Sequence, residues 1–216
     1  ASVRSMKLTS ALLSGLLVLQ AVVAGVSLFV HEKEGRQWEV LLTTPLTSFQ
    51  IVASKLAGGA TGLLPTAAIL LLYNSAISMF HPTGFELWTI ATLPTLIFAL
   101  FAYLMAAAAS LRCATHRGAF GLAMGVVLGL LVGIPMLLAV YSVLPGVEVY
   151  SDDILGATNP GWHLAQASDL LRWNRWWNYS GHFDGLFLLY GFLYAGASGV
   201  VVVWMLGRFD RLAGRA

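Results

Sequence analysis

The stretch HEKEGRQWEVLLTTP, residues 31–45, is the only dense cluster of charge in a chain that is otherwise almost continuously apolar. Four of its first six side chains are acidic or basic. Because each charge placed in hydrocarbon costs roughly a few kcal/mol or more, these residues cannot lie within a bilayer. The stretch is therefore expected outside the membrane, between two membrane spans.

Residue spacing within this stretch predicts a short helix on the membrane surface. Glu32 and Arg36 are four residues apart with the acid first, which is the favourable order for a helical ion pair. Trp38, Leu41 and Leu42 follow at helical spacing on the other side, so the helix would have one charged and one apolar face. We expect it to lie parallel to the membrane, held by the spans on either side.

The sequence after this helix contains a stop signal and a start signal. Pro45 disfavours helical backbone at Thr44 and so ends the first helix. Thr47 and Gln50 have the spacing of a capping box, in which each side chain bonds the backbone N–H of the other residue. A second helix is therefore predicted to begin there and to run straight into the next span.

The composition of the whole chain is that of an integral membrane protein. Of 216 residues, 58% are hydrophobic and 10% are charged, with a mean hydropathy of +0.78, whereas charged residues make up about a quarter of a soluble domain. A net charge of +2, without a basic run interleaved with aromatic residues, gives no reason to expect a nucleic-acid partner. The single cysteine, Cys113, excludes an internal disulfide and a cysteine-based metal site.

Five apolar stretches are long enough to cross a bilayer, which takes about 20 helical residues. None of them has an ionisable residue in its interior. We therefore expect an all-α fold, a polytopic membrane helix bundle that forms a single transmembrane domain over residues 1–216. The spans are expected at about 8–30, 56–80, 87–111, 118–144 and 185–207, with an amphipathic segment at 31–55 and an aromatic-rich loop at 145–184.

The distribution of basic residues predicts the orientation. Eight of the 12 lysines and arginines fall in the set of loops that includes residues 31–55 and the C-terminus, and positively charged loops stay cytoplasmic. Loop 145–184 is then external. Its tryptophans and a tyrosine favour the headgroup layer, where the loop either contributes to a substrate path or anchors the last span. Both interpretations stay open.

A few residues inside the spans indicate packing, bends or a polar path. Glycines recur every four residues at 125, 129 and 133 and would let another helix approach closely. Asn74, with Thr66 and Ser78, forms a weakly polar stripe that faces either a translocation path or a neighbouring helix. Three prolines each remove a backbone hydrogen bond and predict kinks. These are Pro65, Pro94 and Pro135.

The charged stretch and the residues after it resemble the permease subunits of ABC-2 type transporters. In that family a membrane span is followed by the pattern Glu-Arg-Glu-x-Gly-Thr-x-Glu-x-Leu-Leu-x-Thr-Pro-Leu/Val-Ser and then by a Gly-Lys pair. This chain has Arg36-Gln37 in place of the Gly-Thr pair and Ser54 in place of the glycine before Lys55. The matching residues are Glu32, Lys33, Glu34, Glu39, Leu41, Leu42, Thr44, Pro45, Leu46 and Lys55.

The resemblance implies that residues 31–55 hold the coupling helix, which docks on the ATP-hydrolysing subunit of an exporter. Apolar side chains of the helix would make the contact, either with that subunit or with the ends of the spans, and charged side chains would set the orientation. The candidate coupling residues are Glu32, Glu34, Arg36, Trp38, Glu39, Leu41, Leu42, Thr44, Pro45 and Lys55.

The same resemblance implies the partners and the compartment. The chain has no phosphate-binding loop of the form Gly-x-x-x-x-Gly-Lys-Ser/Thr. It is therefore not expected to be an enzyme or to hold a cofactor, and ATP and Mg would bind a separate ABC ATPase chain. Two permease domains would pair, as a homodimer or a heterodimer, in the lipid bilayer of a bacterial inner membrane. The family typically has six spans, so this chain either lacks the first span or has five.

Two other functions have to be weighed. A non-transporting membrane scaffold or assembly factor would use residues 31–45 to bind a cytoplasmic partner. Intramembrane hydrolysis by Ser198, in the sequence Gly-Ala-Ser-Gly, would need a base, yet no histidine follows it. Ion-coupled transport usually needs an ionisable group at mid-membrane, and no predicted span contains one. An external energy source that acts through a surface helix therefore fits best.

Overall fold

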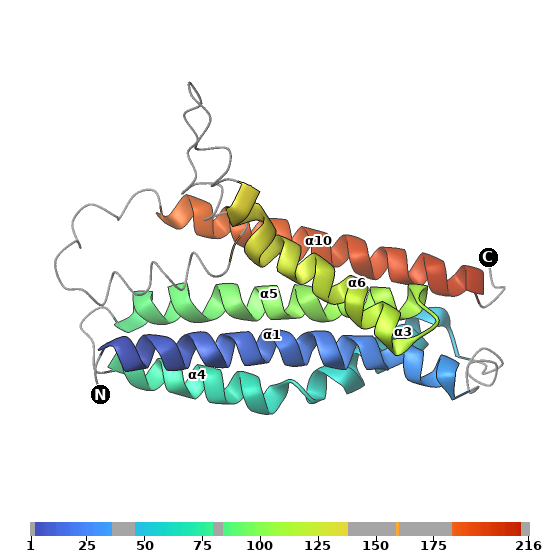
Figure 1. Cartoon of the computed structure of the whole chain (residues 1–216), viewed down its shortest axis with the longest axis horizontal. Helices are drawn as coiled ribbons and strands as arrows, with labels where there is room; N and C mark the ends of the chain where they lie inside the picture. Colours follow the sequence, from blue (N-terminus) through green and yellow to red (C-terminus); the bar gives the residue numbers. More distant parts are fainter. Residues whose placement is uncertain (1–2, 36–45, 80–83, 138–158, 160–182, 213–216) are drawn as a thin grey trace, which may run out of the picture.

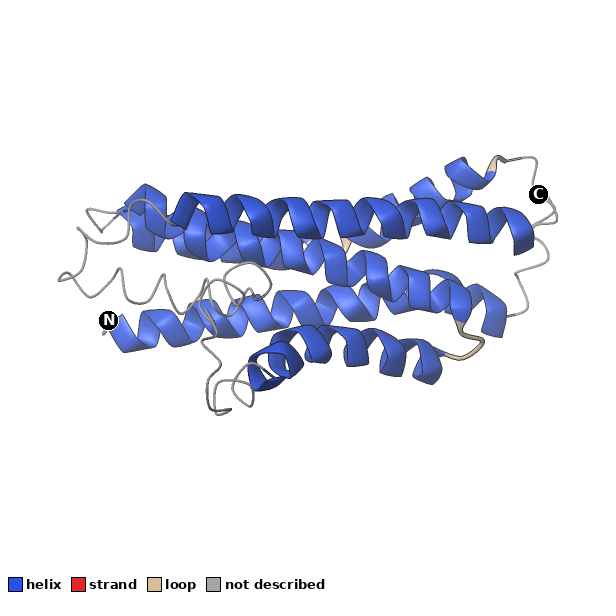
Figure 2. Cartoon of the chain, turned by 90° about the horizontal axis from the view of Figure 1, so that it is seen from above, coloured by secondary structure: helices blue, strands red, loops and turns tan. Residues whose placement is uncertain are grey.

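The computed structural model describes residues 3–35, 46–79, 84–137, 159 and 183–212. Across these residues the regular structure is entirely helical (Figure 2), which confirms the predicted all-α fold. Long helices lie side by side in a bundle (Figure 1). They are α1 (Val3–Glu34), α3 (Ser48–Thr61), α4 (Leu64–Met79), α5 (Gly84–Arg112), α6 (His116–Leu128), the π-helical turn η1 (Gly129–Gly133) and α10 (Phe183–Leu212).

The described helices are those of a multi-pass membrane protein. Four of them are long and apolar enough to cross a bilayer, and there are five spans if the bent pair α3–α4 counts as one. Residues 36–45 of the predicted surface helix 31–45, and most of the predicted loop 145–184, lie outside the described residues. The four unbroken candidate spans are Leu8–Glu34, Thr92–Arg112, His116–Leu137 and Leu189–Arg211.

Helices α1 and α5 lie side by side (Figure 1). They pack closely at Gly25. A Cβ atom at Gly25 would collide with the main-chain oxygen of Tyr103 and would lie 2.7 Å from the Cβ of Ala106. Glycine permits this approach because it has no side chain. The core around it is formed by fully buried aliphatic and aromatic side chains, which include Val22, Val26, Val30, Phe98 and Ala102.

Aromatic side chains join α10 to α5. The ring of Tyr194 meets those of Phe98 and Phe101 edge-on, with centroids 5.4 Å and 5.0 Å away, which is a favoured geometry for aromatic pairs. The hydroxyl of Tyr190 donates a hydrogen bond to the main-chain oxygen of Pro94 at 3.0 Å. Both tyrosines are buried, so α10 is fixed against α5 by rings as well as by a hydrogen bond.

Helix α3 begins as the sequence predicts but ends differently. The side chain of Thr47 accepts a hydrogen bond from the N–H of Gln50, and the side chain of Gln50 accepts one from the N–H of Thr47, which confirms the capping box. The helix does not run straight into the span, because it ends at Thr61 and α4 begins at Leu64 after a bend of 50°. Pro65 has no N–H to donate to the carbonyl four residues earlier, which favours a break at this point.

Asn74 joins three helices. Its side-chain oxygen accepts a hydrogen bond from Ser10 of α1 at 3.0 Å, and its side-chain nitrogen donates one to Thr92 of α5, also at 3.0 Å. All three side chains are buried. Of the two interpretations of this polar residue, the structure therefore favours contact with neighbouring helices. Buried polar groups within a membrane are stabilised by partners of this kind.

The glycines of α6 and η1 make no close approach to the other described helices. A Cβ atom at Gly125, Gly129 or Gly133 would find no heavy atom within 4 Å. All three glycines lie within the candidate span His116–Leu137, which is mostly exposed in the single chain. The predicted helix contact is therefore not made within the described part of the chain.

Candidate functional site

The last turn of α1 carries three consecutive charged residues, Glu32, Lys33 and Glu34. The residue pattern predicts that they belong to a separate surface helix, but in the structure they continue the membrane helix to its end. Each of the three side chains contacts a different helix. We call these residues, together with Lys55 and the turn 113–115 between α5 and α6, the charged end of the bundle.

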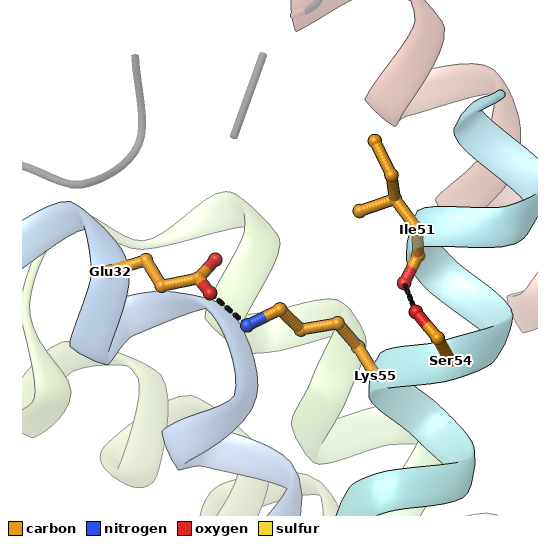
Figure 3. Close-up of polar contacts among 4 residues, drawn as sticks. All are labelled: Glu32, Ile51, Ser54 and Lys55. Atoms are coloured by element: carbon orange, nitrogen blue, oxygen red, sulfur yellow. Dashed lines mark hydrogen bonds and ion pairs between the residues drawn. The ribbon is translucent and has the colours of Figure 1, made fainter. Parts of the chain in front are cut away.

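Glu32 forms an ion pair with Lys55 of α3 (Figure 3). The two side chains point toward one another from α1 and α3, and both are partly buried. Ser54, the departure from the family's glycine, instead donates a hydrogen bond to the main-chain oxygen of Ile51 at 3.0 Å (Figure 3). Because its hydroxyl is satisfied within its own helix, this serine is accommodated beside the ion pair.

Lys33 bonds the carboxyl end of α5. Its ammonium group donates hydrogen bonds to the main-chain oxygens of Ser110, Leu111 and Cys113, at 2.9, 2.6 and 3.2 Å. The last carbonyls of a helix have no partner within the helix, and this end carries a partial negative charge. A lysine with three donors satisfies both requirements, so Lys33 caps α5 from a different helix.

Glu34 bonds the amino end of α6. Its carboxylate accepts a hydrogen bond from the N–H of His116, the first residue of that helix, at 2.9 Å. Thr115 caps the same end by accepting a bond from the N–H of Gly118 at 3.3 Å. A carboxylate is favoured here because the amino end of a helix carries a partial positive charge.

The start of α3 is anchored in the apolar core at the charged end. Ile51 and Val52 are buried in a cluster with Phe29 of α1 and Phe209 of α10. Further along α3, the hydroxyl of Tyr103 donates a hydrogen bond to the main-chain oxygen of Leu56 at 2.6 Å. These contacts fix α3 against three other helices, and its residue Lys55 reaches Glu32 from that position.

The structure brings together three of the ten candidate coupling residues, Glu32, Glu34 and Lys55. The other seven lie outside the described residues, so their placement stays a prediction. The sequence pattern alone does not predict a role for Lys33. A lysine at a helix end is a known partner for helix carbonyls, but its partners here lie 77 to 80 residues later in the chain. The seven undescribed candidates are Arg36, Trp38, Glu39, Leu41, Leu42, Thr44 and Pro45.

The chemistry of the charged end is that of ion pairing and helix capping. Within the ranges that the structure describes, no group of three or more His, Cys, Asp or Glu side chains is arranged to hold a metal ion. The contacts of Glu32, Lys33 and Glu34 instead connect α1 to α3, α5 and α6. Such an arrangement can hold helix ends in place and can transmit a displacement from one to another.

Comparison with known proteins identifies the family of this chain. A family model described as "ABC-2 family transporter protein" matches residues 2–203. No curated protein and no solved structure matches the chain. The family match covers nearly all of the described helices, including the charged end and its contacts. The chain therefore belongs to the ABC-2 family of transporter membrane proteins, as the resemblance of residues 31–55 implied.

Proposed function

We propose that this chain is the permease subunit of an ATP-driven exporter, and that residues 31–55 couple it to a separate ATP-hydrolysing chain. The observation that carries this proposal is the ion pair between Glu32 and Lys55. These residues flank the segment 36–45, which holds much of the family motif. A segment whose two flanks are tied to each other and to the bundle can pass a force to the helices, whereas an untied one would absorb it.

In this mechanism, ATP binds with Mg on the partner chain, and closure of the partner pushes on segment 36–45. The apolar face of the segment supplies the contact, since apolar side chains dominate the buried centre of protein interfaces. Its charged face sets the orientation. The force then reaches α1 and α3 through their linked ends and switches the access of the transport path. The residues expected on the apolar face are Trp38, Leu41 and Leu42. Those expected on the charged face are Arg36 and Glu39.

We place the charged end in the cytoplasm of a bacterial cell, with the permease in the inner membrane and paired with a second permease domain. Arginines support this orientation, because positively charged loops stay cytoplasmic. Arg112 and Arg117 lie on either side of the α5–α6 turn, and both are exposed. Arg208 and Arg211 are exposed near the end of α10.

The test is a pull-down of the tagged chain from its native membranes, followed by identification of bound chains and an ATPase assay. Glu39→Lys is the sharpest variant, because reversing Glu32 or Glu34 would also break contacts within the bundle. We expect the wild type to bring down an ATPase whose hydrolysis is coupled to the permease, and Glu39→Lys to lose that coupling. Glu39→Gln is the matched control, since it removes the charge without reversing it.

Two results would count against the proposal. Full coupling in Glu39→Lys, with the variant inserted in the membrane at wild-type level, would remove the coupling role from segment 36–45. A wild-type chain that brings down no ATPase would instead favour the membrane scaffold or assembly factor.

A further inference from the structure

Lys33 and Glu34, neighbours in the sequence, hold the two sides of one turn. Helix α5 ends at Arg112 and α6 begins at His116, so a three-residue turn connects them. Lys33 places a positive charge against the carboxyl end of α5, and Glu34 places a negative charge against the amino end of α6. Both charges have the sign that the helix dipole favours. The exchanged order, acid before base, would oppose both dipoles.

The two helices that meet at this turn differ in how firmly the chain holds them. In the apolar stretch of α5 that could cross the membrane, 72% is buried within the chain. In the corresponding stretch of the α6 span, 11% is buried. Helix α5 also packs closely against α1 at Gly25. A displacement applied at the turn should therefore move α6 more readily than α5, because fewer packed side chains resist it.

The end of α1 is also where the coupling segment begins. Gly35 follows Glu34 directly, and its N–H bonds the main-chain oxygen of His31 at 3.0 Å, so the helical path continues up to the start of segment 36–45. A push on that segment reaches Glu34 after one residue. The carboxylate of Glu34 is bonded to the first backbone N–H of α6, so a direct route from the end of α1 to the α6 span passes through this bond.

We propose that Lys33 and Glu34 are positioning residues that direct the movement of the coupling segment into α6. Lys33 keeps the end of α1 fixed to α5, and Glu34 carries the displacement to the amino end of α6, which then shifts relative to α10. This inference rests on the proposed function, since it takes segment 36–45 as the place where ATP-driven force enters.

The experiment measures distances between spin labels in the complex purified from native membranes, without nucleotide and after trapping with Mg-ATP and vanadate. Cys113→Ser removes the native thiol and keeps the main-chain oxygen that Lys33 bonds. Labels at Val132 and Val200, both exposed, report on α6–η1 against α10. A reference pair at Leu16 and Leu100 reports on α1 against α5. Dilution with unlabelled chain removes distances between copies.

Three variants test the role of the bond rather than the presence of charge. Glu34→Ala removes the acceptor, and Glu34→Gln keeps an oxygen that can accept but has no charge. Arg211→Ala removes an exposed charge from the last turn of α10 as the matched control. We expect trapping to shift the Val132–Val200 distance in the wild type and the control, less in Glu34→Gln and not in Glu34→Ala. The reference distance should stay constant throughout.

The outcomes separate this inference from the proposed function. One outcome would overturn the inference and leave the proposed function standing. In it, the ATPase binds and hydrolyses ATP, and the Val132–Val200 distance in Glu34→Ala and Glu34→Gln shifts as it does in the wild type. The same holds if the trapped wild type shows no shift. If the wild type brings down no ATPase, the proposed function fails and the inference fails with it. Should Glu34→Ala not insert, Glu34→Gln decides: a shift equal to that of the wild type overturns the proposal, and a smaller one supports it.

Discussion

The side chain of Gln20 in α1 donates a hydrogen bond to the main-chain oxygen of Gly62, 3.0 Å away, at the break between α3 and α4. The oxygen of the same amide accepts a hydrogen bond from the hydroxyl of Thr66, beyond the break. One side chain therefore holds both sides of the bend. Gln20 lies near the middle of the apolar span Leu8–Glu34, where lipid supplies no alternative partners for backbone groups.

Replacing Gln20 with leucine should therefore destabilise the bundle. The variant leaves the oxygen of Gly62 without its side-chain donor, and hydrogen bonds between membrane helices are worth about 0.6 kcal/mol on average and up to about 1.7. Unfolding of the detergent-solubilised chain by denaturant measures the difference. Ser27→Ala is the control, because the hydroxyl of Ser27 bonds Ala24 within α1 and joins no second helix. Equal losses in the two variants would show that Gln20 does not hold the bend.

Glycine-to-alanine changes should have opposite effects in α1 and α6. At Gly25 the added methyl group would collide with the backbone of α5, and overpacking of this kind costs about 1–3 kcal/mol. At Gly121 it would meet nothing within 4 Å, so the variant should gain up to about 1 kcal/mol from the better helix propensity of alanine. Denaturant unfolding of both variants beside the wild type tests this. A Gly25→Ala variant with the same free energy of unfolding as the wild type would contradict the close packing of α1 on α5.

Sequence analysis predicted the local signals at the charged end better than the distant contacts. The capping box of Thr47 and Gln50 depends on residues three apart, so the pattern alone was sufficient. Pro65 predicted a bend, but its detailed form depends on Gln20, 42 residues before Gly62. The role of Lys33 was missed because its partners belong to α5, and the packing of α1 on α5 brings them together.

The ion pair between Glu32 and Lys55 should show a small, measurable coupling energy. Both side chains are partly buried, with 15% of Glu32 and 25% of Lys55 exposed, so we expect about 1 kcal/mol in a double-mutant cycle, at the upper end for pairs that solvent reaches. The cycle uses Glu32→Ala, Lys55→Ala and the double variant, with unfolding free energies measured in detergent at low ionic strength. The energy should decrease when salt is added, because screening weakens exposed pairs. If the losses of unfolding free energy in the two single variants add up to the loss in the double variant, the pair does not tie α3 to α1.

Near the end of the α6 span, the side chain of Asn159 takes the place of a backbone N–H that Pro135 lacks. Pro135 has no N–H to donate to the main-chain oxygen of Leu131 four residues earlier, and the side chain of Asn159 donates a hydrogen bond to that oxygen at 2.9 Å. We expect Asn159→Leu to lower the free energy of unfolding by about 1–2 kcal/mol, since it removes the donor from a carbonyl in the span. The loss should be smaller in a Pro135→Ala background, where the new backbone N–H can donate instead. An equal loss in both backgrounds, measured by denaturant unfolding, would show that Asn159 does not substitute for the missing amide.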